Sequence, residues 1–460
     1  MRRAILGALL LVVGVAAVVA YTTVTRDREY ARRIAAGDNA IATGRELDAI
    51  EDFTAALTLK PASMLAYFKR GELYRRRGEW TSALRDLSYA ARLDPLAPRP
   101  LERLGDAHYA LGRFGRAVER YTEYVALDDR SPRVLYKLAL ARQRNGMVAS
   151  AIDAARQALV LQEDFPEAYY LLGTCLQEEG QHGDAAAALE RAVELAPTMT
   201  VAREQLAGLY RDLGETRKAI DALRALTAID PDRSDWEIEL GLAYARAGRT
   251  DQAVQTLSRA AERYPDSAEV YVAAGRVWLE IAERRADPVA LGKAIEALQR
   301  PIATNAPTSE TLTLLGRALL RSDEVHAAVR ILEQAVDTLP VDPDAFVWLV
   351  EAARRLDLPL VARDALVDHR LLVGLPEAAS ERTAFAVSVA ELSLAGEEPA
   401  TAAKWFGRAL ESSDEVALWV RLVEAELSAG ATDDARAATA TGLDRHPGHP
   451  ALLAIPHRLP

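Results

Sequence analysis

The chain has 460 residues, of which half are apolar and 27% are charged. Its 56 Lys and Arg residues face 67 Asp and Glu residues, which gives a formal net charge of -11. Sequence-independent binding to nucleic acid needs clustered Lys and Arg, and no long basic run is present, so we expect no nucleic-acid partner. Cys175 is the single cysteine, which excludes an intrachain disulfide and any metal site built from several cysteines.

The N-terminal segment is apolar without interruption from Ala4 to Ala20 and follows Arg2 and Arg3. Extended to Val24, the segment would span about 30 Å as a helix, which is roughly the hydrocarbon thickness of a bilayer. We therefore expect residues 1–25 to form a signal-anchor or transmembrane helix, with membrane contact through residues 4–24. The alternative is a cleaved signal peptide, whose apolar core is usually about 7 to 15 residues long.

This expectation predicts a single-pass membrane protein. A basic pair before the first apolar segment is the usual arrangement for export, and it favours an extracytoplasmic (periplasmic) body. Arg26, Arg28, Arg32 and Arg33 follow the segment and favour the opposite, cytoplasmic orientation. The charges therefore leave both orientations open.

From Tyr30 onward the chain has a 34-residue period. Small residues recur at this step in three registers: Gly44, Gly78, Gly112, Gly146, Gly180, Gly214 and Gly248; Ala49, Ala83, Ala117, Ala151, Ala185, Ala219 and Ala253; and Gly37, Gly71, Gly105, Ala139, Gly173, Ala207, Gly241 and Gly275. A period between about 20 and 50 residues is typical of a stacked-repeat architecture. In such an array each unit packs only on its neighbours.

Each repeat contains two amphipathic helical patterns separated by a polar turn. In residues 166–197, apolar residues recur at helical spacing on both sides of Gly180: Tyr169, Leu172 and Leu176 before it, and Ala185, Leu189 and Ala192 after it. Pro197 closes the unit, because proline cannot continue the preceding helix. The pattern predicts a helix-turn-helix hairpin.

The pattern resembles the tetratricopeptide repeat, whose 34-residue unit has preferred residues at fixed offsets. One full unit that fits consists of Tyr67, Gly71, Tyr74, Ala83, Leu87, Ala90 and Pro95. The resemblance implies an all-α, right-handed solenoid of about twelve antiparallel hairpins. It also implies that the first helices of the hairpins line a concave groove that binds a peptide or protein.

The regular step between matching glycines is lost between Gly275 and Gly316, where it becomes a 41-residue step. We expect regular units over residues 26–275, a unit with an insertion over 276–307, divergent hairpins over 308–447 and an irregular tail over 448–460. Terminal repeats of such arrays are commonly atypical.

The resemblance also implies which residues face the groove. The groove positions of the N-terminal half are aromatic or basic: Phe68, Tyr109, Tyr136 and Tyr170, with Arg75, Arg76, Arg99, Arg133 and Arg144. Aromatic and Arg side chains dominate interface hot spots, so we expect this face to bind an acidic peptide or a C-terminal carboxylate. The alternative is that these arginines form intramolecular ion pairs with Glu72, Glu102 and Asp106.

No catalytic motif is present, so we expect no enzyme, no cofactor, no metal and no small-molecule substrate. His446, His449 and His457 could in principle hold zinc, but they lie in a proline-rich segment and we expect them to be solvated. We expect Cys175 to be a buried thiol. The sequence thus predicts a membrane-anchored scaffold or adaptor for assembly of an envelope complex. The alternative is an accessory factor of polysaccharide biogenesis that contacts glycan or lipid, for which Trp80, Trp236 and Trp278 are the available indoles.

Overall fold

The computed structural model describes the backbone of residues 2–304 and 307–455, and the side chains of residues 11–302 and 307–455. Within these ranges all regular structure is α-helical, with 25 helices and no strand. The contacts divide the chain into two compact units, Met1–Ala222 and Leu223–Pro460. Each unit is described by itself.

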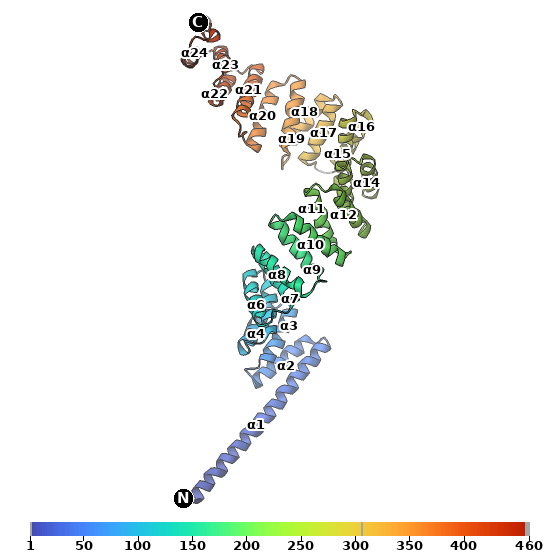
Figure 1. Cartoon of the computed structure of the whole chain (residues 1–460), viewed down its shortest axis with the longest axis vertical. Helices are drawn as coiled ribbons and strands as arrows, with labels where there is room; N and C mark the ends of the chain where they lie inside the picture. Colours follow the sequence, from blue (N-terminus) through green and yellow to red (C-terminus); the bar gives the residue numbers. More distant parts are fainter. Residues whose placement is uncertain (1, 305–306, 456–460) are drawn as a thin grey trace. The chain divides into compact units, whose positions relative to one another are not determined.

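The first unit contains α1 (Arg2–Ala42), α2 (Glu46–Leu59), α3 (Met64–Arg76), α4 (Trp80–Leu93), α5 (Pro98–Ala110), α6 (Phe114–Leu127), α7 (Pro132–Arg144), α8 (Val148–Leu161), α9 (Pro166–Glu178), α10 (His182–Leu195) and α11 (Thr200–Asp212). The boundary between the units falls within α12 (Thr216–Ile229). In this unit odd-numbered helices pack antiparallel on the even-numbered helices that follow them, as α3 does on α4 (Figure 1).

The second unit continues with α13 (Ser234–Arg246), α14 (Thr250–Arg263), α15 (Ala268–Arg285), α16 (Pro288–Thr304), α17 (Ser309–Arg321), α18 (Val325–Asp337), α19 (Pro343–Arg355), α20 (Pro359–Val373), α21 (Ala379–Ala395), α22 (Pro399–Ser412), α23 (Val416–Ser428), α24 (Thr432–Arg445) and α25 (Pro450–Leu453). Its helices pair in the same way, from α13 with α14 to α23 with α24. The described residues therefore form an α-helical repeat solenoid, as the 34-residue period predicts.

The first glycine register forms the turn inside each hairpin. Gly44, Gly78 and their equivalents up to Gly248 all have φ between 69° and 76°, a left-handed conformation that costs an L-residue energy. The amide after the glycine closes the turn, as where Glu79 N donates to Tyr74 O at 2.8 Å. This bond satisfies a carbonyl that the end of a helix leaves without a partner.

The glycines near the middle of the first helices allow the two helices of a hairpin to approach each other. A Cβ atom on Gly105 would lie 2.4 Å from the ring of Tyr121, and one on Gly241 would lie 2.5 Å from Cγ of Leu257. Both partners stand sixteen positions after their glycine, on the second helix. Ala139 breaks the glycine register, and there the residue sixteen positions later is the smaller Ala155.

The longer step after Gly275 falls on the hairpin of α15 and α16. These helices have 18 and 17 residues, whereas α13 and α14 have 13 and 14. The additional residues lengthen both helices, and the pair still packs through Gly275, whose added Cβ would lie 2.5 Å from Cγ of Leu298.

The expectation about the N-terminal segment is corrected. α1 runs from Arg2 to Ala42, and its last turns pack on α2 through Ile34, Ala40 and Phe53. Among the helices of the described residues, none combines the length and the apolar character that a membrane crossing requires. The uninterrupted apolar run ends at Ala20, and it reaches the length of a span only by including Tyr21, Thr22 and Thr23, whereas about 20 apolar residues are needed.

The predicted single-pass membrane protein, with its signal anchor and its membrane contact through residues 4–24, is therefore wrong. The expected periplasmic body rested on that anchor. The expected role in assembly of an envelope complex also rested on it.

Candidate functional site

The odd-numbered helices of the first unit form the face on which the predicted groove residues lie. Neighbouring odd-numbered helices also contact one another, as α3 does α5 and α7 does α9. Such contacts place these helices on the inner side of a curved array. These helices start at Met64, Pro98, Pro132 and Pro166, which recur at the 34-residue period, so equivalent positions of successive repeats lie at the same place in each helix.

Ion pairs link consecutive odd-numbered helices on this face. Lys69 Nζ lies 2.5 Å from Asp38 Oδ1, Arg103 Nε lies 3.2 Å from Glu72 Oε2, and Lys137 Nζ lies 2.8 Å from Asp106 Oδ1. In each pair the basic residue follows the acidic residue at the same spacing along the chain. Successive pairs are one 34-residue repeat apart. We call these three pairs the ion-pair ladder. It ties the first four hairpins together through charges that are only partly exposed.

Asp106 is the most highly coordinated member of the ladder. Besides Lys137, it accepts hydrogen bonds from Arg103 Nη1 at 3.0 Å and from the hydroxyl of Tyr121 at 2.8 Å. Burial alone would raise the pKa of Asp106, but Lys137, Tyr121 and Arg103 together hold it below its usual value. Burial and the same carboxylate raise the pKa of Tyr121. Asp106 is therefore an ionised anchor and not a proton donor at neutral pH.

Some of the predicted groove arginines already form ion pairs with carboxylates of the same chain. Arg75 binds Glu72, with Nη2 at 2.6 Å from Oε1, and Arg76 lies 3.6 Å from Glu46. For Arg75 the intramolecular alternative is therefore observed. Glu102 and Asp106 pair instead with Arg103 and Lys137, two residues that the groove positions did not include. The repeated, constant spacing from acid to base was the sequence signal that could have identified them.

Three of the predicted arginines have no carboxylate partner among the described residues: Arg99, Arg133 and Arg144. All three are exposed. Arg99 and Arg133 stand at the second position of successive odd-numbered helices, α5 and α7, one repeat apart. They carry positive charge that the protein itself does not neutralise.

The predicted aromatic residues lie on the odd-numbered helices α3, α5, α7 and α9 and are half-buried. Tyr109, Tyr136 and Tyr170 pack against one core cluster of the first unit, and the ring of Tyr136 lies 5.1 Å from the ring of Phe165. Burial raises the pKa of Tyr136, with smaller contributions from Glu167, Tyr109 and Tyr170, so the structure brings the three tyrosines together. Phe68 packs separately, against a cluster around Leu87.

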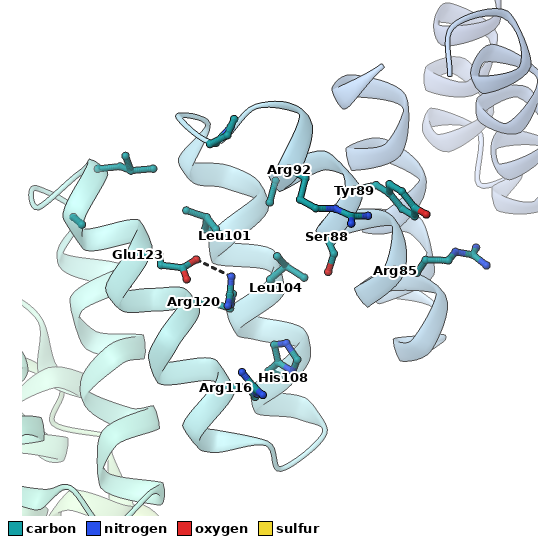
Figure 2. Close-up of a pocket in the computed structure, with 14 residues that line it drawn as sticks. Arg85, Ser88, Tyr89, Arg92, Leu101, Leu104, His108, Arg116, Arg120 and Glu123 are labelled. Carbon is teal, nitrogen blue, oxygen red and sulfur yellow. Dashed lines mark hydrogen bonds and ion pairs between the residues drawn. The ribbon is translucent and has the colours of Figure 1, made fainter. Parts of the chain in front are cut away.

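A cavity of about 790 Å³ opens on the opposite side of the first unit, between the even-numbered helices α4 and α6 (Figure 2). It is basic: Arg85, Arg92, Arg116 and Arg120 line it, and Leu101 and Leu104 of α5 form its floor. His108 Nδ1 is buried there and has no hydrogen-bond partner among the described residues. Burial, followed by nearby arginines, lowers the pKa of His108.

Much of the positive charge in this cavity is neutralised internally. Arg116 pairs with Glu119 at 2.9 Å, and Arg120 pairs with Glu123 at 2.8 Å, as Figure 2 shows for the second pair. Arg92 lies over the ring of Tyr89 at 4.4 Å. The cavity is thus less strongly charged than its four arginines suggest.

Comparison with known proteins agrees with the repeat geometry. Family profiles described as tetratricopeptide repeat match residues 34–98, 70–133, 102–163 and 313–368, and also residues 210–277. Together they cover more than half of the chain. The chain is a tetratricopeptide-repeat protein. A further profile, described as subunit 3 of the anaphase-promoting complex or cyclosome, matches residues 144–226.

Solved structures similar to this tetratricopeptide-repeat protein include YrrB, described as a TPR protein with an unusual peptide-binding site. It is 24% identical over 40% of this chain and 95% of its own, with a TM-score of 0.36. MamA from Desulfovibrio magneticus RS-1 is 22% identical over 37% and 96%, with a TM-score of 0.36. Yeast Tom70 is 14% identical over 94% and 99%, with a TM-score of 0.39. No curated protein matches the chain in sequence. At these scores the likenesses support no statement about function.

Other candidate residues of the tetratricopeptide-repeat protein are occupied in packing. Cys175 is fully buried, and burial raises its pKa to about 12, so the predicted buried thiol is confirmed. Trp236 is 3% exposed, and Lys293 lies 4.4 Å from the ring of Trp278. Trp236 is therefore buried in the core, and Lys293 lies against the ring of the partly buried Trp278.

The histidine cluster is only partly described. His446 Nε2 lies 3.5 Å from Asp414, and His449 Nδ1 accepts a hydrogen bond from Ala451 N at 3.3 Å, which caps α25. His457 lies outside the described residues. Within the described part of the chain, no group of three or more His, Cys, Asp or Glu side chains is arranged to hold a metal ion.

Proposed function

We propose that the protein is a tetratricopeptide-repeat scaffold that binds a peptide segment of a partner protein on the odd-numbered helices of its first unit. The observation that carries the proposal is the placement of Arg99 and Arg133. They are exposed and have no carboxylate partner among the described residues, although acidic side chains of the same face are engaged in the ion-pair ladder.

The chemistry of this face favours an acidic segment or a C-terminal carboxylate. An arginine can bind a carboxylate with two parallel hydrogen bonds. The half-buried rings of Tyr109, Tyr136 and Tyr170, on α5, α7 and α9, offer further contact area, with little loss of side-chain freedom on binding because they are already packed. Specificity then comes from the spacing of the two arginines, which the 34-residue repeat sets.

The experiment is affinity capture of the partner with the full chain and with the double variant Arg99→Glu, Arg133→Glu. We expect the variant to lose most of the captured partner, because two attractive contacts become repulsive. Arg156→Glu is the matched control: Arg156 is exposed in the same unit and has no carboxylate partner among the described residues, but it stands on the even-numbered α8. Equal capture by the wild type and the double variant would contradict the proposal.

A further inference from the structure

A second pocket lies in the second unit, in the divergent part of the repeat array. It is lined by residues of α20, α21 and α22 and has a volume of about 400 Å³, within the range of ligand pockets in proteins. Like the cavity of Figure 2, it lies between two even-numbered helices with the odd-numbered helix as its floor. The pocket thus opens on the face formed by the even-numbered helices, with α21 beneath it.

The walls of this pocket are apolar and open to solvent. Leu371 is 79% exposed and Leu375 is 65% exposed. Below them Phe385 and Trp405 meet edge to face, with ring centroids 5.5 Å apart. Neighbouring Leu372 is 51% exposed. Contiguous exposed apolar surface beside a pocket is typical of an interaction site.

The same pocket is basic and almost free of internal neutralisation. Arg370, Arg382 and Arg408 line it, and none of them forms an ion pair within the described residues. Arg370 Nε is buried and has no hydrogen-bond partner in the part of the chain that the structure describes, and Arg408 lies over the ring of Trp405 at 4.3 Å. Glu411 is the single acidic residue of the lining.

The contrast with a neighbouring arginine on the same helix is informative. Arg363, also on α20, pairs with Asp364 at 2.7 Å and with Glu398. Arg370 stands about two helical turns further along and has no carboxylate partner within residues 11–302 and 307–455. A buried guanidinium nitrogen without a partner is costly, and a carboxylate from outside the chain would supply one.

We propose that this pocket docks an acidic, leucine-bearing segment of a partner protein. A bulky apolar side chain of the segment packs between Leu371 and Leu375 against Trp405. A carboxylate about one turn away pairs with Arg370 and Arg408. The pocket is independent of the face proposed above, because it uses other residues in the other unit.

The test uses the full chain and three fluorescent dodecapeptides in an anisotropy titration. The first peptide has two leucines one turn apart flanked by aspartates; the second has lysines in place of the aspartates; the third has alanines in place of the leucines. We expect the first to bind at least tenfold more tightly than either of the others. Equal affinities, or no binding of the first, would overturn the proposal.

Charge reversal then identifies the site. In the variant Arg370→Glu, Arg408→Glu we expect the acidic peptide to bind at least tenfold more weakly and the lysine peptide to gain affinity. Arg330→Glu is the matched control, since Arg330 is exposed on α18, outside the pocket. Unchanged binding of both peptides to the double variant would refute the assignment, whereas a variant that had merely unfolded would bind neither.

Two further measurements distinguish this pocket from the face of the first unit and from self-association. In Arg99→Glu, Arg133→Glu we expect the acidic leucine peptide to keep its tight binding, because that binding depends on the apolar contacts of the pocket in the second unit. Loss of tight binding in this variant alone would place the site on the first unit and overturn the docking proposed here. Light scattering of the wild type and of Leu371→Ser tests whether a second copy of the chain covers the pocket. If the wild type forms a dimer that Leu371→Ser dissociates, a second copy of the chain covers the pocket, and the docking of a partner's segment would be overturned.

Discussion

Single side chains decide how closely the helices of a hairpin approach. The glycines at the eighth position of the first helix of a hairpin differ from other helical glycines. The side chain sixteen positions later occupies the space in which a Cβ atom would lie. Gly105 faces the ring of Tyr121, whereas Gly208, also inside a helix, has only Arg211 Nη2 at 3.9 Å from an added Cβ.

This difference predicts opposite effects of one substitution. Gly105→Ala should lower the free energy of unfolding by about 1–3 kcal/mol, because the ring of Tyr121 must move. Gly208→Ala should raise it by about 0.5–1 kcal/mol, because alanine is the better helix former. Urea unfolding followed by circular dichroism measures both. Stabilisation by both substitutions would show that the contact with Tyr121 does not constrain the hairpin.

Glu426 on α23 is a single residue that makes the stability of the fold depend on pH. One of its carboxylate oxygens is buried and accepts no hydrogen bond from any described residue. Burial, helped by the charge of Asp434, raises the pKa of Glu426 to about 7. Because the unfolded value is about 4.3, the folded state binds the proton more tightly. Stability therefore falls as pH rises from about 4.3 to about 7 and then levels.

Glu426→Gln should remove this loss. We expect the variant to be more stable than the wild type at pH 8 and close to it at pH 4.5, as judged from thermal unfolding at the two values. Glu424→Gln serves as the control on the same helix, since Glu424 is exposed. An equal gain for Glu426→Gln at both pH values would show that ionisation of this group is not the cause.

At the scale of the helix and its turn, the left-handed turn position is occupied by glycine in some hairpins and by an acidic residue in others. The regular hairpins place glycine at the left-handed turn position. In the second unit Asp323, Asp357 and Glu397 adopt positive φ at equivalent turns, and Glu397 has φ of 58°. The hydrogen bond that follows is kept, since Glu398 N donates to Ser393 O at 2.8 Å.

The turns with non-glycine residues are therefore sites where stability can be gained. Glu397→Gly should raise the free energy of unfolding by about 1 kcal/mol, and Gly430→Ala, at the corresponding turn of the next hairpin with φ of 76°, should lower it by about as much. Chemical denaturation of the two single variants and the double variant checks this. Two changes of the same sign would contradict the turn argument.

At the scale of the whole molecule, contacts between hairpins hold the array together, since each hairpin packs only on its neighbours. In the first unit the ion-pair ladder adds charge pairs to this packing, and Asp106 joins α5, α6 and α7 through Lys137 and Tyr121. Loss of one such carboxylate affects several helices at once.

Asp106→Asn should therefore lower the free energy of unfolding by about 1–3 kcal/mol at pH 7, in the range of hydrogen bonds to charged groups. The pKa of Asp106 is depressed in the folded state, so its contribution is present above the unfolded value of about 3.9 and is lost as pH falls through the folded pKa. The difference between wild type and variant should shrink in acid, as pH-dependent unfolding measures. Asp48→Asn, in an exposed pair with Arg45, should change little.

The repeat fold was predictable because its signals are local. A glycine with positive φ, a proline at a helix start and apolar residues at helical spacing act within one hairpin, and the 34-residue period multiplies them. That Tyr109, Tyr136 and Tyr170 face one groove was implied only by the family resemblance and stays a prediction. The predicted membrane span over residues 4–24 was wrong, because it reached its length only by including the polar residues Thr22 and Thr23.

The sequence by itself thus determined the all-α repeat array and the positions of the glycine turns from Gly44 to Gly248. Only the tertiary structure decided which charges are free: it pairs Asp106 with Lys137, nearly one repeat further along the chain, and leaves Arg99 and Arg370 without carboxylates in the described chain. The physical reason is that ion pairs and pockets between hairpins depend on how neighbouring units stack. That stacking brings together residues that no single helical pattern relates.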